Sequence, residues 1–306
     1  MMEQANQTRL WWILIAVGLS LFLGAVDGSI VNIALPTLMA VFQADFPTIQ
    51  WVSLSFLLGI NLFLLSAGRL ADLVGKKTVF VAGLGIFLAG SALCGFSPGA
   101  YWLIVFRFFQ AIGAAMTVGL GIAIVTETWP AQRRGQAIGI TGGILSLGIV
   151  AGPTLGGMIL QLLNWRWIFF VNLPLGALAL ALVLIYVPPL KPARSGETFD
   201  IPGALLVGLC MLAFSLALTL GQNLGFSSLA ILALFVLGAA CVPLFLWRER
   251  RARHPMLDLA LFRNAEFSVS LLAGIFPFVC ISGVIFLMPF YLTLVMGLSQ
   301  RDTGLL

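Results

Sequence analysis

Long apolar runs alternate with short polar segments along the whole chain. Nine of these runs are long enough to cross a bilayer as helices, since about 20 apolar residues span the hydrocarbon core. They cover roughly residues 10–40, 49–71, 78–96, 101–127, 136–160, 166–187, 202–221, 228–247 and 267–296. The first run is too long for the apolar part of a cleavable signal, so we expect it to remain as a spanning helix. The pattern predicts an all-α polytopic membrane protein.

Composition agrees with a surface that faces lipid. Sixty per cent of the residues are hydrophobic, 9% are charged and the mean hydropathy is +1.08, whereas about 25% of residues are charged in a soluble domain. The net charge of +5 does not indicate a nucleic-acid partner, because the lysines and arginines lie in short gaps between apolar runs. We find no catalytic cluster, phosphate-binding loop or metal-type cysteine spacing, so neither an enzyme nor a bound cofactor is predicted.

The positive charges also predict the orientation. If the N-terminus is cytoplasmic, thirteen of the sixteen lysines and arginines fall on the cytoplasmic side, as the positive-inside rule requires. We therefore expect a protein of the plasma membrane with a cytoplasmic N-terminus. The expected divisions are a six-helix bundle over residues 1–187, a cytoplasmic linker over 188–200, an inserted helix pair over 201–248, a basic cytoplasmic segment over 249–266, and the first helix of a second bundle over 267–306. The basic segment is predicted to be a surface helix that binds anionic lipid.

A carboxylate interrupts the first apolar run. Asp27 lies nine residues before Pro36, which puts it roughly 13 Å inside the membrane if the spanning part ends there. At that depth a charge costs several kcal/mol unless it is paired, protonated or in contact with water. Arg107, six residues into the fourth run, reaches a similar depth from the outer face, so the two could pair. Two alternatives remain open: Asp27 is an inert, water-accessible acid, or Arg107 extends to the outer surface as an anchor. Asn32 is predicted to form a hydrogen bond between helices.

The turn after the second run has a distinctive spacing. Gly68-Arg-Leu-Ala-Asp72-Leu-Val-Gly75-Lys76-Lys77 combines glycines that permit a tight turn with one acid and two basic residues. An ordinary basic turn would explain the lysines but not the complete spacing. Glu127, at the cytoplasmic end of the fourth run, is either a solvated or ion-paired helix end or a member of a network around Asp72.

The fifth run contains Gly148-Ile-Val-Ala-Gly152-Pro153-Thr-Leu-Gly156-Gly157. Glycines at every fourth position form a ridge without side chains, against which another helix can pack closely, and Pro153 is expected to kink the helix. A helix-packing motif is the simplest explanation. A second ridge at residues 135, 139 and 143 predicts close packing on another side as well.

These patterns resemble signatures of the major facilitator superfamily, and the resemblance covers almost the whole chain. Residues 68–77 match the loop motif of that family, with Leu73 where a basic residue is common, and residues 103–115 resemble its fourth-helix motif, with Ala111 where a glycine is usual. Residues 148–157 resemble the fifth-helix signature of antiporters. Residues 165–176 are similar to the same position in the drug/proton antiporter branch with fourteen helices.

The resemblance implies a fold, a function and a set of site residues. The fold would be the major facilitator fold, with about nine of a probable fourteen helices present, and the function would be proton-coupled export of small, lipophilic or cationic compounds by alternating access. The energy source would be the proton gradient, without a cofactor. The implied roles are proton coupling for Asp27, Arg107 and Glu127, a cytoplasmic gate for Gly68, Asp72, Gly75, Lys76, Lys77 and Arg134, and a hinge for Gly148, Gly152, Pro153, Gly156 and Gly157.

Two other functions remain open. One is a facilitator that carries a nutrient or metabolite by uniport or symport, and the other is a fragment that is inactive in transport. The second alternative follows because one bundle cannot enclose a substrate between two halves, so the missing C-terminal helices would be needed for transport.

Overall fold

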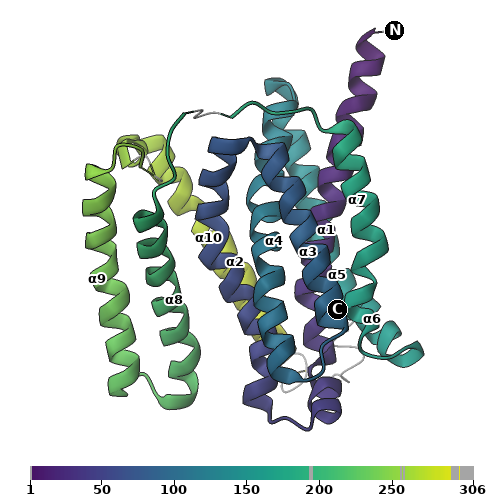
Figure 1. The fold of residues 1–306 in the computed structure, drawn as a ribbon, viewed down its shortest axis with the longest axis vertical. Helices are drawn as coiled ribbons and strands as arrows, with labels where there is room; N and C mark the ends of the chain where they lie inside the picture. Colours follow the sequence, from purple (N-terminus) through teal and green to yellow (C-terminus); the bar gives the residue numbers. More distant parts are fainter. Residues whose placement is uncertain (1, 193–195, 256, 258, 291–295, 297–306) are drawn as a thin grey trace. The chain divides into compact units, whose positions relative to one another are not determined.

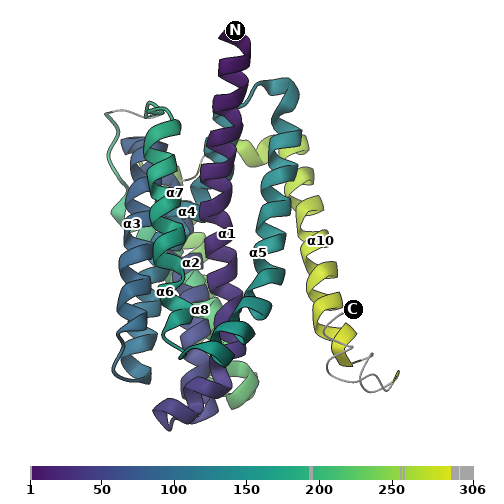
Figure 2. The ribbon, with the colours of Figure 1, turned by 90° about the vertical axis from the view of Figure 1, so that its right-hand side faces the viewer.

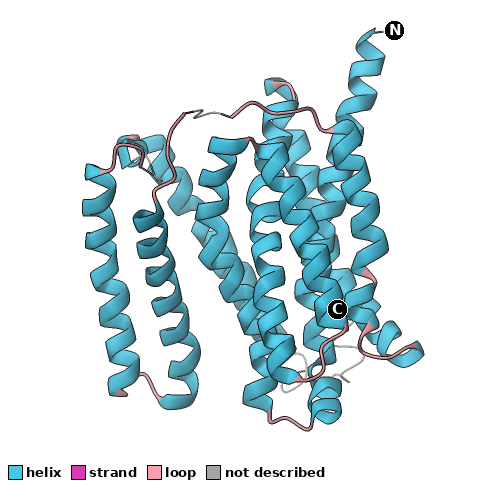
Figure 3. Ribbon diagram, in the orientation of Figure 1, coloured by secondary structure: helices cyan, strands magenta, loops and turns pink. Residues whose placement is uncertain are grey.

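The computed structural model describes residues 2–192, 196–255, 257, 259–290 and 296. The chain divides into two compact units, residues 1–256 and 257–306. The described part of each unit is built of helices joined by short loops and turns (Figure 3).

The first unit contains the helices labelled α1 to α9 in Figure 1, and Figure 2 shows the same ribbon turned by 90°. Their bounds are α1 Met2–Phe42, α2 Phe46–Val74, α3 Lys76–Gly95, α4 Ala100–Thr128, the 3₁₀ helix η1 Ala131–Arg133, α5 Arg134–Leu162, α6 Trp167–Phe170, α7 Asn172–Tyr186, α8 Ile201–Leu224 and α9 Leu229–Arg251. The second unit contains the 3₁₀ helix η2 Leu259–Arg263 and α10 Ala265–Phe290.

Most of the predicted spans coincide with helices of the required length. Within the described residues, eight helical segments are long and apolar enough to cross a membrane, and the segment 167–186 among them combines α6 and α7. The ninth predicted span, 267–296, falls largely on α10, which is apolar over Ala265–Pro277. Its last residues lie outside the described part.

Helix α1 contacts most of the other helices of the bundle. It packs mainly against α5 and α7, while α4 packs against α2 and α3, and α8 joins this group through α2 (Figure 2). Glycines allow the closest approaches between α3 and α4: a Cβ at Gly90 would lie 2.6 Å from the Cα of Gln110, and one at Gly83 would lie 2.5 Å from the Cβ of Met116. This close packing brings polar residues of α3 and α4 together in the interior.

Gly75 makes the tight turn between α2 and α3. Its φ of +107° lies where side chains are strongly disfavoured, and a Cβ there would lie 2.9 Å from the carbonyl oxygen of Leu190. Its N–H donates to the carbonyl of Ala71 at 2.8 Å and so caps α2. The turn therefore needs glycine both for its conformation and for its contact with the chain after α7.

The predicted single helix 166–187 is divided in the structure. Helix α6 ends at Phe170 and α7 begins at Asn172, with Val171 forming a turn between them. Arg166 extends back to the end of α3, where its Nη1 donates to the carbonyls of Gly95 at 2.9 Å and Ser97 at 3.2 Å. The break places Asn172 at the start of a helix and inside the bundle.

Two further expectations differ from the structure. The basic segment is not a separate surface helix, because α9 continues to Arg251 and the chain then runs irregularly towards η2. Pro255 would oppose a longer helix, since its ring would clash with the carbonyl of Arg251 four residues earlier. The second glycine ridge of α5 is not packed either: within the described residues, nothing lies within 4 Å of a Cβ built at Gly135, Gly139 or Gly143.

Candidate functional site

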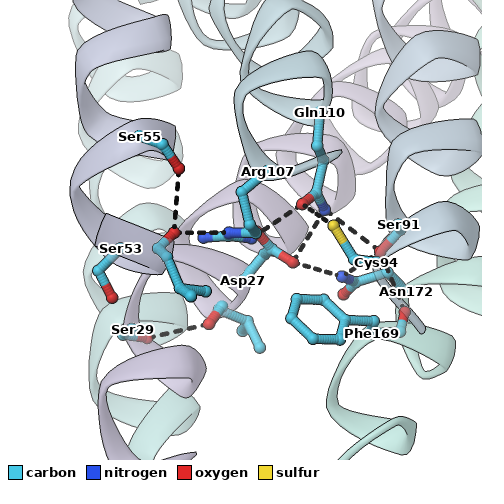
Figure 4. A network of polar contacts seen from close by, with 12 residues as sticks. Asp27, Ser29, Ser53, Ser55, Ser91, Cys94, Arg107, Gln110, Phe169 and Asn172 are labelled. Carbon is cyan, nitrogen blue, oxygen red and sulfur yellow. Dashed lines mark hydrogen bonds and ion pairs between the residues drawn. The ribbon is translucent and has the colours of Figure 1, made fainter. Parts of the chain in front are cut away.

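Asp27 and Arg107 form an ion pair in the interior of the bundle (Figure 4). The contact joins Arg107 Nη1 to Asp27 Oδ2, and both residues have an exposed fraction of 0%. Arg107 therefore does not extend to the outer surface. Because removing two charges from water costs several kcal/mol per ion, such a pair persists only when further hydrogen bonds satisfy both groups.

Neutral donors complete the environment of the Asp27 carboxylate. Its Oδ1 accepts hydrogen bonds from Gln110 Nε2 at 3.0 Å and from Asn172 Nδ2 at 2.7 Å. The same two amide nitrogens donate to Ser91 Oγ at 3.2 and 2.9 Å, and the Ser91 hydroxyl donates to the carbonyl of Phe169 at 3.0 Å. Gln110, Asn172 and Ser91 are all completely buried. The carboxylate thus accepts from one cation and two amides.

The Arg107 guanidinium has partners on three helices. Besides Asp27, its Nη1 donates to Gln110 Oε1 at 2.8 Å, and its Nε donates to the Val52 carbonyl on α2 at 3.3 Å. Its Cζ lies 3.9 Å from the ring centre of Phe56, a cation–π contact. Arg107 therefore connects α4 to both α1 and α2, so a movement of any one of these helices would change its contacts.

Asn172 and Ser91 belong to this network, although the sequence analysis assigned a role to neither. Asn172 lies in the segment 165–176, whose sequence is similar to the same position in the fourteen-helix antiporter branch. Its position depends on the break at Val171, which the apolar pattern does not show. Asn32, in contrast, makes an interhelical contact of the predicted kind, because its Oδ1 accepts from Ser53 Oγ on α2 at 2.9 Å.

Glu127 lies far from this buried network. It is twenty positions beyond Arg107 on the same helix, about 30 Å at helical rise, and its Oε2 is 2.6 Å from Lys76 Nζ. Lys77 Nζ donates to the Leu184 and Val187 carbonyls at 2.9 and 2.6 Å and so caps α7. The structure therefore groups Glu127 with the turn after α2 rather than with Asp27.

The other residues of the predicted gate make fewer contacts. Arg134 Nε donates to the Trp129 carbonyl at 3.2 Å, and a Cβ at Gly68 would have open space. Asp72 is half-buried, and among the described residues its carboxylate has no ion pair or side-chain hydrogen bond. The gate role of Asp72 stays a prediction.

Arg69, within the loop motif, has a stronger contact than its neighbours. It is 2% exposed, and its Nη2 lies 2.7 Å from Glu197 Oε2 on the segment between α7 and α8. The same carboxylate oxygen is 3.6 Å from His254 Nδ1. Glu197 therefore connects the end of α2 to the chain on both sides of the α8–α9 pair.

The glycine ridge of α5 packs against α1 beside Asp27. A Cβ at Gly148 would lie 2.8 Å from the Phe22 carbonyl, one at Gly152 would overlap Ser29 Oγ, and one at Gly156 would lie 2.8 Å from Ile30 Cγ1. Gly157 has open space around it. Pro153 lies inside the continuous helix and faces outward. Three glycines of the predicted hinge thus form the contact surface between α5 and α1.

The family model of the Major Facilitator Superfamily matches residues 17–306. This chain belongs to the major facilitator superfamily. The assignment confirms the expected family, which consists of membrane transporters rather than enzymes. Together with the eight candidate spans, it makes the protein an integral membrane protein with several helical spans.

Relatives within the superfamily include proteins named for drug resistance and one named as a riboflavin transporter. The chain is 36% identical to the riboflavin transporter RibZ of Clostridioides difficile, with 96% of this chain and 63% of that protein covered. It is 37% identical to the multidrug resistance protein Stp of Mycobacterium tuberculosis, with 98% of this chain and 56% of Stp covered. It is 29% identical to the tetracenomycin C resistance and export protein of Streptomyces glaucescens, with 97% of this chain and 55% of that protein covered. The chain spans between half and two thirds of the length of these relatives.

A solved facilitator structure supports the fold independently. The proton:xylose symporter XylE, bound to 6-bromo-6-deoxy-D-glucose, matches with a TM-score of 0.62 at 15% identity, covering 98% of this chain and 66% of XylE. The expected all-α facilitator fold is therefore confirmed.

Proposed function

We propose that this chain forms the proton-coupling part of a secondary transporter that exports small, lipophilic or cationic compounds by alternating access. The observation that carries the proposal is the buried contact between Asp27 and Arg107, supported by two amide donors. An intramembrane acid that is paired and inaccessible is typical of a proton pathway in a facilitator.

The coupling step follows from the geometry of the pair. A proton on Asp27 would remove the anion that Arg107 contacts, so protonation and ion pairing exclude each other. Arg107 would then need another partner, and because it also contacts α2 through the Val52 carbonyl, its movement would alter the packing of α1, α2 and α4. Proton uptake would in this way favour a different arrangement of these helices.

The contacts beside the buried pair and those at the turn between α2 and α3 suit such a rearrangement. The glycines at 148, 152 and 156 give α5 a smooth surface on α1, along which the helices could slide or rock. We assign the opposing gate to the Lys76–Glu127 pair and to the turn at Gly75. This places Glu127 in the gate rather than in proton coupling.

The direction of transport and the substrate class rest on the relatives. Stp and the tetracenomycin C protein are named for drug resistance and export, which fits the antiporter-type glycine ridge. We place the protein in the plasma membrane with its N-terminus in the cytoplasm, as the distribution of positive charges predicts.

A chimera tests the proposal. This chain is joined to the part of Stp that the match leaves uncovered, and efflux of a lipophilic cation is measured in everted vesicles with and without a pH gradient. We expect gradient-dependent efflux that is lost in Asp27→Asn. Because that change leaves Arg107 without its anion, Asp27→Asn/Arg107→Gln is measured beside it at matched protein level. Full gradient-dependent efflux in either variant would exclude Asp27 from coupling.

A metabolite carrier is the second candidate, because the riboflavin transporter is 36% identical to this chain. In the same vesicles, the two functions are distinguished by whether riboflavin competes with the lipophilic cation for transport. Riboflavin that abolishes efflux of the cation at micromolar concentration, and is itself carried, would favour this second function.

A further inference from the structure

Two adjoining cavities lie where α8 and α9 meet the rest of the first unit. One is a polar cavity of about 350 Å³ near the start of α8 and the end of α9. The other is an apolar cavity of about 590 Å³ between α2 and α8. Phe199 and Ile201 line both, so a polar cavity and an apolar cavity lie side by side. Figure 1 shows that the start of α8 and the ends of α2 and α9 lie at the same end of the first unit as the N-terminus.

The polar cavity carries an excess of positive charge. Arg248 is compensated by Asp200, at 2.8 Å, but Arg251 and Arg253 have no carboxylate within ion-pair distance among the described residues. Both are exposed and both line the cavity. Arg251 stacks on Trp247, with its Cζ 4.5 Å from the ring centre. The cavity therefore offers two unpaired guanidinium groups to an anion.

Two buried atoms of the same cavity lack hydrogen-bond partners within the described residues. They are Asp200 Oδ2, an acceptor, and Arg248 Nε, a donor. The Asp200 side chain is 3% exposed, so leaving its oxygen unsatisfied is costly. An anion alone would satisfy the guanidinium but not the carboxylate oxygen. A phosphate that also carries a hydroxyl group would satisfy both.

The apolar cavity has the length of a lipid chain. It extends along α8 from Ile201 to Leu212, roughly 16 Å at helical rise, which is about half the thickness of the hydrocarbon core. Its walls are almost entirely apolar, and they include Leu62, Phe63, Leu205 and Gly208. Gly208 widens the space, because a Cβ there would lie 3.0 Å from Leu62 Cδ1.

We propose that this space binds one anionic phospholipid of the leaflet that the positive charges predict to be cytoplasmic. The phosphate contacts Arg251 and Arg253 and accepts from Arg248 Nε. A headgroup hydroxyl donates to Asp200 Oδ2, and one acyl chain lies between α2 and α8. The lipid thereby fills the gap between the six-helix bundle and the α8–α9 pair. Phosphatidylglycerol has the required chemistry, since it combines a phosphodiester with glycerol hydroxyls.

Lipid binding is measured on the 306-residue chain, purified in uncharged detergent, by native mass spectrometry during titration with phosphatidylglycerol. Phosphatidylcholine with the same acyl chains tests the charge requirement, and glycerol phosphate tests whether the headgroup suffices. We expect one saturable phosphatidylglycerol that phosphatidylcholine and millimolar glycerol phosphate do not displace.

Variants locate the site. Arg251→Gln/Arg253→Gln should weaken phosphatidylglycerol binding at least tenfold, because each arginine near a lipid surface contributes about fivefold. Arg250→Gln is the matched control, since Arg250 lies in the same last turn of α9 but does not line the cavity. Ala204→Phe, which fills the apolar cavity, should also weaken binding. Ala233→Phe on the exposed side of α9 should not.

Other results overturn the proposal. Equal affinity for phosphatidylcholine would exclude the charged site, and displacement by glycerol phosphate alone would show a simple anion site without an acyl chain. Equal binding by Arg251→Gln/Arg253→Gln and Arg250→Gln would place the lipid elsewhere. Circular dichroism and gel filtration of each variant distinguish lost binding from lost folding, and Ala204→Phe provides a test that leaves every charge unchanged.

Discussion

Arg107 of α4 and Asp27 of α1 are eighty residues apart in the sequence and form an ion pair in which both residues are completely buried. The pair, its direct partners and the Ser91 hydroxyl that supports them form a network that draws on six helices, α1, α2, α3, α4, α6 and α7. The pair is therefore a point at which most of the bundle is held together, and its two charges depend on each other.

The first prediction is that single and double substitutions at this pair differ in stability. Asp27→Asn or Arg107→Gln leaves one buried charge without its partner, which costs about 3 to 5 kcal/mol. Asp27→Asn/Arg107→Gln removes both charges, so its free energy of unfolding should fall by less than that of either single variant. Thermal unfolding in detergent measures the three variants. A double variant as unstable as the sum of the singles would show that the two side chains act independently.

The second prediction concerns the amide of Asn172. In Asn172→Leu, Asp27 Oδ1 and Ser91 Oγ each lose a donor, at 2.7 and 2.9 Å, and a buried group left unsatisfied costs about 1 to 3 kcal/mol. The matched control is Asn32→Leu, because Asn32 also contacts a neighbouring helix but is exposed. Asn32→Leu should change the free energy of unfolding by no more than about 0.5 kcal/mol. Equal losses in urea or thermal unfolding would remove Asn172 from the supporting network.

The contrast between Asn32 and Asn172 shows how far the sequence could lead. Apolar runs predict helices well, as in the run 78–96 and helix Lys76–Gly95, because hydrocarbon forces every backbone group to bond within its own segment. That Asp27 and Arg107 could meet was predictable because helical rise is constant and puts the two residues at a similar level. Which neutral side chains surround a charge depends on how the helices pack, and periodicity does not encode that.

Breaks within a helix and the choice of packing partner were also not predictable from the sequence. The run 166–187 is interrupted by Arg166 at its start and by Asn172 and Pro174, yet its average hydropathy stays high enough to predict one helix. Hydropathy therefore does not locate the turn at Val171 that directs Asn172 inward. Likewise, the two glycine ridges of α5 look equivalent in sequence, yet only that of Gly148, Gly152 and Gly156 has a partner among the described residues. Small residues permit close packing, but they do not select the neighbour.

The third prediction uses this difference between the ridges. Gly152→Ala places a Cβ against Ser29 Oγ and 3.1 Å from the Ile30 nitrogen, so α5 must move away from α1. This movement should lower the free energy of unfolding by about 1 to 3 kcal/mol. Gly143→Ala, in the same helix, meets nothing within 4 Å and should be neutral or gain up to about 1 kcal/mol from helix propensity. Unfolding in detergent compares them, and transport by the chimera should fall only in Gly152→Ala. If both variants behave alike, the ridge has no special role.

The fourth prediction concerns Glu197 and the segment between α7 and α8. Its partner Arg69 is 2% exposed, so Glu197→Gln leaves a buried guanidinium without an anion and should loosen this segment. Glu127→Gln is the matched control, because Glu127 is also paired to a basic residue of the loop motif, but its side chain is 40% exposed and such pairs contribute at most about 1 kcal/mol.

Hydrogen exchange measures the effect directly. Peptides covering residues 186–200 should exchange faster in Glu197→Gln than in the unchanged chain, while Glu127→Gln should leave them unaltered. The reason is that opening of a segment becomes easier when the contacts that hold it are removed. The bundle interior, followed in peptides of α4, should keep its protection in both variants. Unchanged exchange at 186–200 in Glu197→Gln would mean that the Arg69 contact does not hold this segment in place.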